Sequence, residues 1–189
     1  MTNLYFVRHS KIKYTADDYS RPLSEDGKRA VPFVTQAFET IKVDAIVSSP
    51  YIRVIDTIDG ISKSKGIEIE LYHDLRERKV SNTFIDDFQT FTMNQWDDFD
   101  FKLVEGESLN EVISRGTNTL KNIIDKYKGK NIVVGTHGTF MSVCLKYFDP
   151  SIDFEFWRNV KMPDVYKATF DGHKMIQLEN IDISNAEVI

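Results

Sequence analysis

Short apolar runs alternate with segments of helical periodicity along most of this chain, and this alternation constrains the fold more than any other feature. The run Leu4–Val7, with two aromatics and a β-branched residue, is typical of a buried strand. Strands that alternate with helices pack as a parallel sheet covered on both faces. We therefore predict a three-layer α/β/α sandwich with a mostly parallel central sheet. Strands are expected at 4–7, 44–48, 67–71, 131–134, 166–170 and 175–179, and helices at 24–41, 49–61, 108–124 and 138–148.

Two of the predicted strands end in a histidine. Leu4–Val7 leads directly into Arg8 and His9, and the apolar run at 131–134 is followed closely by His137. In open α/β sheets, ligands bind at the carboxyl ends of the strands. If these two strands are neighbours in one sheet, both imidazoles open into the same crevice.

Further polar side chains are expected at the same edge. Arg53 lies in the first turn of a helix that Ser49 and Pro50 are expected to start, so its guanidinium can reach over the sheet. Taken alone, such an arginine is more often an ordinary solvated residue. Glu77 follows the strand at 67–71 in a loop. The helix that begins near Gly138 adds backbone N–H groups with partial positive charge, which form a seat for an anion.

The combined set admits two kinds of ligand. Two imidazoles and a carboxylate are groups that bind zinc. Two guanidiniums, which cannot lose their protons, would repel a dication at the same spot. The set therefore indicates a pocket for a dianion, and phosphate is the obvious candidate because planar guanidinium groups hold its oxygens in pairs. We expect no metal and no cofactor. The residues of this set are Arg8, His9, Arg53, Glu77 and His137.

The composition argues against several classes of partner. The 24 basic and 29 acidic residues give a net charge of -5, which disfavours nonspecific binding to nucleic acid. No leader peptide is recognisable, and no apolar run approaches the ~20 residues that cross a bilayer. The single cysteine, Cys144, suits a reducing compartment and falls on the apolar face of a helix as buried filler. We expect a cytoplasmic protein with one domain over residues 1–189, and these features place no constraint on its oligomeric state.

Residues 78–106 do not fit the alternation of strands and helices. Phe84, Phe88 and Phe91 fall on one helical face, and Trp96 follows beside a run of aspartates. We interpret this segment as a small inserted cap over the carboxyl edge of the sheet. Its aromatic side chains are expected mainly to pack the cap against the rest of the protein. The alternative is that these aromatics also line a substrate pocket.

Six short motifs occur in a fixed order between Leu4 and Phe148. The first, Arg8-His9-Ser10, is similar to the Arg-His-Gly signature of the histidine phosphatase superfamily, also called phosphoglycerate mutase-like. Each motif is weak alone, but together and in the family's order they outweigh the interpretation of Arg53 as a solvated residue. The other five are Arg21 to Gly27, Ser48 to Arg53 with Thr57, Leu75 to Arg78, Gly106 to Ser108, and Thr136 to Gly138.

The resemblance implies a metal-independent phosphatase that hydrolyses a small-molecule or protein-borne phosphomonoester. His9 would attack phosphorus and form a phosphohistidine, which requires a neutral imidazole. Glu77 would protonate the leaving oxygen and then take a proton from the attacking water. Catalysis would also involve His137. The phosphate would be held by Arg8, Arg53, His137 and the backbone at Gly138.

The chain departs from the family pattern in the loop after the first strand. Thr15 stands where many members carry an asparagine that contacts the phosphate, so Lys11 or Lys13 is expected to serve instead. Glu107 is a second candidate for the acid, because basic residues follow Glu77. Two other functions stay open: a phosphoglycerate mutase, and a noncatalytic module that binds phosphorylated ligands.

Overall fold

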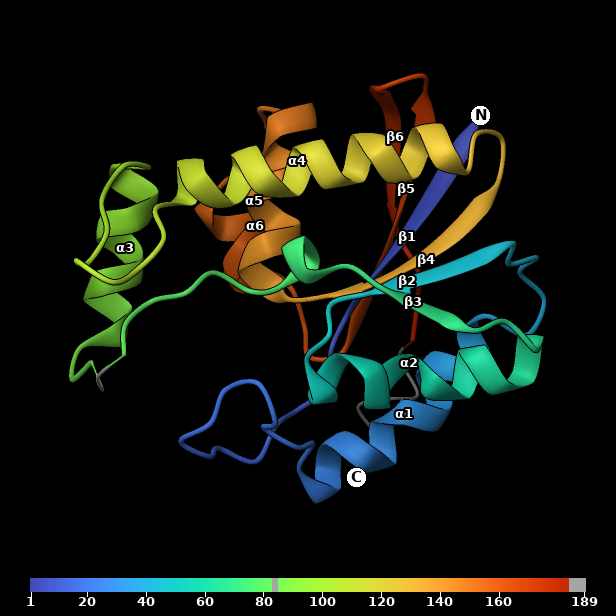
Figure 1. Ribbon diagram of the computed structural model, residues 1–189, viewed down its shortest axis with the longest axis horizontal. Helices are drawn as coiled ribbons and strands as arrows, with labels where there is room; N and C mark the ends of the chain where they lie inside the picture. Colours follow the sequence, from blue (N-terminus) through green and yellow to red (C-terminus); the bar gives the residue numbers. More distant parts are fainter. Residues whose placement is uncertain (83–84, 184–189) are drawn as a thin grey trace.

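A six-stranded sheet forms the centre of the protein in the computed structural model, which describes residues 1–82 and 85–183. The strand order is β3-β2-β4-β1-β5-β6 (Figure 1). Strands β1 to β4 run parallel, whereas β5 is antiparallel to both of its neighbours. The predicted mostly parallel sheet is confirmed. The strands are β1 (Thr2–Arg8), β2 (Ala45–Ser48), β3 (Ile69–Leu71), β4 (Asn131–Thr136), β5 (Asp164–Asp171) and β6 (Lys174–Asn180).

Helices cover both faces of the sheet, which gives the predicted three layers (Figure 1). The side chains of β1 alternate between two cores: Leu4 and Phe6 pack with α4 and α5, and Tyr5 and Val7 pack with α1 and α2. Among the described helices, none is long and apolar enough to cross a bilayer. The helices are α1 (Glu25–Ala37), α2 (Ile52–Lys65), the short 3-10 turn η1 (His73–Leu75), α3 (Phe88–Asp97), α4 (Leu109–Lys126), α5 (Gly138–Phe148) and α6 (Phe154–Asn159).

Two helices begin at the capping residues that the sequence predicts. Ser24 accepts a backbone N–H of the first turn of α1, and Ser108 and Glu111 form a reciprocal capping box at α4. The end of α1 differs from the prediction, because the helix stops at Ala37 and not near Ile41. A tight turn follows, and it brings the side chain of Ile41 onto the core although its backbone is no longer helical.

Close approach of α4 and α5 depends on a glycine. A side chain at Gly116 would collide with the Sγ atom of Cys144 and the ring of Phe140. Cys144 is fully buried at this contact, and burial raises the pKa of its thiol. The prediction that this cysteine is buried filler is confirmed.

Aromatic packing holds α3 against the rest of the molecule. Figure 1 shows α3 beyond the N-terminal end of α4. Phe91 is buried, and the Trp96 ring lies 6.0 Å from Phe154 and 6.3 Å from Trp157, between centroids. Phe84, which was expected on the same helical face, lies outside the described residues. The sequence did not predict α6, the helix that supplies the opposing aromatic rings.

Candidate active site

The carboxyl ends of β1 and β4 bring the two histidines together. The strands are hydrogen-bonded neighbours, with Arg8 opposite Thr136 in the register. Each strand ends one residue before a histidine, so His9 and His137 project from the same edge. Their ring centroids are 5.3 Å apart and their planes meet at 69°. The two strands are neighbours as predicted, and the two imidazoles lie against each other.

His9 is held as a neutral ring with one nitrogen free of hydrogen. Its Nδ1 lies 2.8 Å from the carbonyl oxygen of Ser10, and because a carbonyl oxygen only accepts, Nδ1 carries the ring hydrogen. The Nε2 atom therefore keeps its lone pair. Burial, followed by the positive charges of Arg53, Arg8 and Arg21, lowers the pKa of His9 to about 3, although the hydrogen bond to Ser10 acts in the opposite direction.

His137 is fully buried and is oriented by Ser49. Its Nε2 lies 2.9 Å from the Ser49 hydroxyl, and its ring meets the ring of Tyr51 at a centroid distance of 5.1 Å. Burial lowers the pKa of His137 well below its usual range, and the charge on Arg53 adds to this effect. The sequence predicted Ser49 as the cap of α2, but Tyr51 is the N-cap and makes no side-chain cap bond. The Ser49 hydroxyl contacts the histidine instead.

Arg53 enters the site from the first turn of α2 and is buried, with 3% of its surface exposed. Its Nη1 donates to the carbonyl oxygen of Asp18 at 2.6 Å and lies 3.2 Å from the Asp18 carboxylate. Its guanidinium covers the ring of Tyr51 at 4.8 Å. The interpretation of this arginine as an ordinary solvated helix residue is wrong.

Arg8 lies against the start of α5. Its Nη1 donates to the backbone carbonyls of Val160 and Lys161. A Cβ atom at Gly138 would lie 2.8 Å from the Cζ and Nε atoms of Arg8, so only glycine leaves room for this guanidinium. Gly138 thus helps to place Arg8 at the edge where the histidines meet.

The loop between β1 and α1 contributes an arginine that the sequence analysis did not single out. Arg21 lies close enough to His9 for its charge to lower the pKa of that ring, after the larger effects of burial, Arg53 and Arg8. It donates to the carbonyl oxygen of Thr15 at 2.8 and 3.1 Å, and its Nη1 lies 2.6 Å from the Asp18 carboxylate. Its place just before Pro22 in a motif that had already been noted could have drawn attention to it.

The two lysines proposed from the same loop lie in a different environment from Arg21. Lys11 and Lys13 take part in backbone hydrogen bonds to the segment 22–24, and Lys11 is exposed. Neither is among the principal charges that lower the pKa of His9, whereas Arg21 is. Arg21 is therefore the better candidate for the phosphate contact that was expected near Thr15.

Glu77 occupies the anion seat at the start of α5. Its Oε2 accepts the backbone N–H of Thr139 at 3.1 Å, and its Oε1 accepts the N–H of Phe140 at 3.0 Å and that of Arg78 at 2.9 Å. Its charge raises the pKa of both Arg8 and Arg53, against the larger opposing effect of burial. The sequence assigned the N–H groups at this helix start to the phosphate, but those of Thr139 and Phe140 bind a carboxylate of the protein itself.

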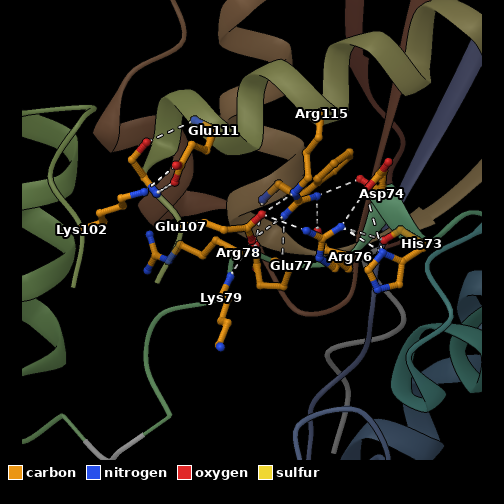
Figure 2. A network of polar contacts seen from close by, with 12 residues as sticks. His73, Asp74, Arg76, Glu77, Arg78, Lys79, Lys102, Glu107, Glu111 and Arg115 are labelled. Atoms are coloured by element: carbon orange, nitrogen blue, oxygen red, sulfur yellow. Dashed lines mark hydrogen bonds and ion pairs between the residues drawn. The ribbon is translucent and has the colours of Figure 1, made fainter. Parts of the chain in front are cut away.

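Glu107, the second candidate for the acid, is engaged elsewhere. Its two carboxylate oxygens accept hydrogen bonds from Arg115, Arg76 and the backbone N–H of Lys79, at 2.7 to 3.0 Å (Figure 2). Burial raises its pKa, but the hydrogen bonds and charges of this network, led by Arg115, outweigh that effect and lower it. Glu107 is therefore a charged partner of arginines and not an acid with a proton to give.

Metal-ligating groups do not converge at the site. Across residues 1–82 and 85–183, no cluster of three histidine, cysteine, aspartate or glutamate side chains has a metal-binding arrangement. Arginines are the main charged side chains that lower the pKa values of the two imidazoles. Three of the site's buried nitrogens have no hydrogen-bond partner among the described residues: Arg8 Nε, Arg53 Nε and His137 Nδ1.

Comparisons with known proteins agree with this geometry. Residues 4–175 match the histidine phosphatase superfamily, branch 1. Phosphoglycerate mutase-like protein 4 of Arabidopsis thaliana is 29% identical over 154 residues, which are 70% of this chain and 64% of that protein. The chain thus spans less than two thirds of that relative's length.

Solved structures share the fold over nearly the whole chain. YhfR of Bacillus stearothermophilus superposes with a TM-score of 0.77 at 21% identity, covering 93% of this chain and 95% of that one. A phosphoserine phosphatase mutant from Entamoeba histolytica, solved in complex with phosphoserine, has a TM-score of 0.77 at 16% identity and covers 100% of both chains. With the matched motifs and the paired histidines, these findings lead to one conclusion: the chain belongs to the histidine phosphatase superfamily, branch 1.

Proposed function

We propose that the protein is a phosphatase that hydrolyses a phosphomonoester through a phosphohistidine at His9. The observation that carries this proposal is the state of the His9 ring. Its Nδ1 hydrogen is donated to Ser10, its Nε2 lone pair is free, and its pKa of about 3 keeps it unprotonated at neutral pH. A neutral imidazole with a fixed tautomer is what attack on phosphorus requires.

The positive groups around His9 support transfer of a phosphoryl group. Arg8, Arg53 and Arg21 all act on the His9 ring electrostatically, and His137 lies against it. As the phosphoryl group passes from oxygen to nitrogen, its equatorial oxygens keep their negative charge. Guanidinium groups that are already in place stabilise that charge without reorganisation, which is the largest share of catalysis in sites of this kind. These groups need no metal to balance the charge.

Glu77 is the proposed proton donor. Its charge acts on both Arg8 and Arg53, the arginines proposed to hold the phosphate, which supports a role for Glu77 at the leaving oxygen. Three backbone N–H groups hold this carboxyl group in position. The donor role requires that Glu77 enter the reaction with a proton, which it passes to the leaving oxygen as the bond to phosphorus breaks. Water then attacks the phosphohistidine and returns its proton to Glu77.

The test uses p-nitrophenyl phosphate with and without a chelator. We expect chelator-resistant release of nitrophenol, and loss of at least about a thousandfold in His9→Ala because the covalent route is removed. A radiolabelled phosphoryl group trapped by rapid denaturation should be labile in acid, stable in base and located on His9. His173→Ala is the matched control, since this exposed histidine bonds to Asp125 and lies in the hairpin turn.

The same assays separate the alternatives. Phosphoryl exchange on 3-phosphoglycerate that depends on a bisphosphoglycerate primer would favour a mutase, the activity that the name of the Arabidopsis relative suggests. Tight binding of phosphate esters without turnover would favour a noncatalytic module. Activity lost with chelator and restored by zinc would overturn the metal-independent mechanism. A panel of small phosphate esters, with phosphoserine first because of the Entamoeba complex, and of phosphopeptides would then define the substrate.

A further inference from the structure

Arg115 uses its whole guanidinium to hold the backbone up to Glu77 and the carboxylate of Glu107. Its Nη1 donates to the carbonyl oxygens of Asp74 at 2.8 Å and Arg76 at 3.0 Å, and its Nη2 donates to the carbonyl oxygen of Glu77 at 3.2 Å. Its Nε and Nη2 donate to the carboxylate of Glu107 at 2.7 and 3.0 Å (Figure 2). These five hydrogen bonds equal the five donors of an arginine side chain.

Glu107 holds the backbone on the other side of Glu77. It accepts the backbone N–H of Lys79 at 2.8 Å and the Nη2 of Arg76 at 3.0 Å. The segment is therefore fixed before Glu77 by Arg115 and after it by Glu107. Both side chains are mostly buried, at 12% and 17% exposure, and form one ion pair.

The side-chain carboxylate of Glu77 is held by a second element, the start of α5. It accepts the N–H groups of Thr139 and Phe140 at the start of α5. The Arg115 guanidinium also lies 5.6 Å from the centroid of the Phe140 ring. One side chain of α4 thus contacts both the segment that carries the carboxylate and the helix that receives it.

We propose that Arg115, with Glu107 as its counterion, is a positioning residue that sets where the Glu77 carboxyl meets the leaving oxygen. The inference rests on the proposed function, because it concerns the proton step of that reaction. Proton transfer needs heavy atoms at hydrogen-bond distance, and a displacement on the order of 1 Å removes much of its benefit. A loop segment has no regular hydrogen-bonding ladder, so its precision must come from side chains such as these.

The relative rates on two kinds of ester distinguish a misplaced acid from a loss of folded enzyme. A nitrophenolate leaves readily without protonation, whereas the alkoxide of an alkyl phosphate does not. A misplaced acid therefore slows alkyl phosphates much more than p-nitrophenyl phosphate. A variant that only lowers the amount of folded enzyme slows both esters equally.

The experiment compares kcat and KM for p-nitrophenyl phosphate and β-glycerophosphate. In Arg115→Met we expect kcat on the alkyl ester to fall about 100-fold and kcat on the aryl ester less than about 10-fold, with KM for both within about threefold. Glu77→Gln should show the same selectivity in stronger form. Lys102→Ala is the matched control, because it removes an exposed ion pair to Glu111 on the same helix and should leave the ratio of the two rates unchanged.

Two further variants keep the test decisive if Arg115→Met does not fold. Glu107→Gln retains the shape of the counterion, and Arg115→Lys retains the charge without the forked donors. Each should lower the alkyl-to-aryl ratio about tenfold. An unchanged ratio in the folded variants overturns the inference. If Glu77→Gln alone shifts the ratio, only the role of Arg115 fails; if His9→Ala remains active, the proposed function itself fails.

Discussion

The imidazole rings of His9 and His137 meet edge to face, with 5.3 Å between their centroids. Both rings are buried, and burial lowers the pKa of each, to about 3 for His9 and well below the usual range for His137. Two protonated imidazoles at this separation would repel each other and the neighbouring arginines. The site therefore keeps two neutral imidazoles side by side, close to the positive charges of Arg8 and Arg53.

Stability should fall as the pH drops below about 6.5. The unfolded chain binds protons at its histidines below that pH, whereas folded His9 stays unprotonated down to about pH 3. The unfolded state then carries more protons, and each such histidine lowers the free energy of unfolding by up to about 1.4 kcal/mol per pH unit. Urea denaturation at pH 7.5 and pH 5.0 measures this loss.

Variants assign the loss to the buried rings. His9→Gln and His137→Gln should each reduce the difference between the two pH values by up to about 2 kcal/mol. His173→Gln changes an exposed histidine and should leave the difference as in the original protein. Equal pH dependence in all four proteins would contradict the neutral state of the buried pair.

Ser49→Ala should slow catalysis by loosening His137. The Ser49 hydroxyl accepts the N–H of Tyr51 at 3.4 Å and is free to donate its hydrogen to His137 Nε2 at 2.9 Å. Removing a partner that orients a site residue typically costs about tenfold or more in rate. Ser48→Ala is the control, because this equally buried hydroxyl bonds to the Ser49 carbonyl. If kcat is the same for both variants, Ser49 does not orient the ring.

Gly138→Ala should act through Arg8. The added Cβ would lie 2.8 Å from the guanidinium carbon and displace it, so kcat/KM should fall about 100-fold. Arg8→Ala should give a comparable loss, and the double variant should be no worse than Arg8→Ala alone. Losses that multiply would mean that alanine at this position damages the site by another route. Thermal unfolding of each variant reports any effect on folding.

Asp18→Asn should strengthen binding of inorganic phosphate. The Asp18 carboxylate lies 2.6 Å from Arg21 and 3.2 Å from Arg53, where it competes with an anion for both guanidiniums. Asp18 is 47% exposed, and pairs of this kind contribute roughly 0.2–1 kcal/mol, so the inhibition constant for phosphate should fall about two- to fivefold. Asp17→Asn is the control, since Asp17 bonds within its own loop to Ser20 and Tyr19. A weaker phosphate affinity in Asp18→Asn would show that this carboxylate organises the arginines.

The strands and the paired histidines could be predicted because they depend on short-range patterns. Leu4–Val7 and the run at 131–134 are apolar throughout, and each leads to a histidine at the same edge of the sheet. The end of α1 could not be predicted, because Ile41 keeps the helical spacing while a turn places it on the core.

The supporting residues escaped prediction for a different reason. Arg115 lies in the middle of an amphipathic helix, where its sequence position indicates only a solvated face. Its partners at 74–77 and 107 come together only once α4 and the loop before α3 have packed. Ser49 fitted a helix cap equally well, and only the burial of His137 beside it identifies its actual partner.

The position of β1 in the sheet has a consequence for how the chain acquires its site. Its partners are β4 and β5, so that Asn3 bonds to a residue 128 positions later and Arg8 to Val160, 152 positions later. Contacts between such distant segments form slowly because a long loop must close first. During synthesis, β1, which leads to His9, leaves the ribosome before β4 and β5 and can pair with them only later. The candidate site therefore forms only after these later segments are available, and a shortened chain that lacks Val160 and β5 cannot complete it.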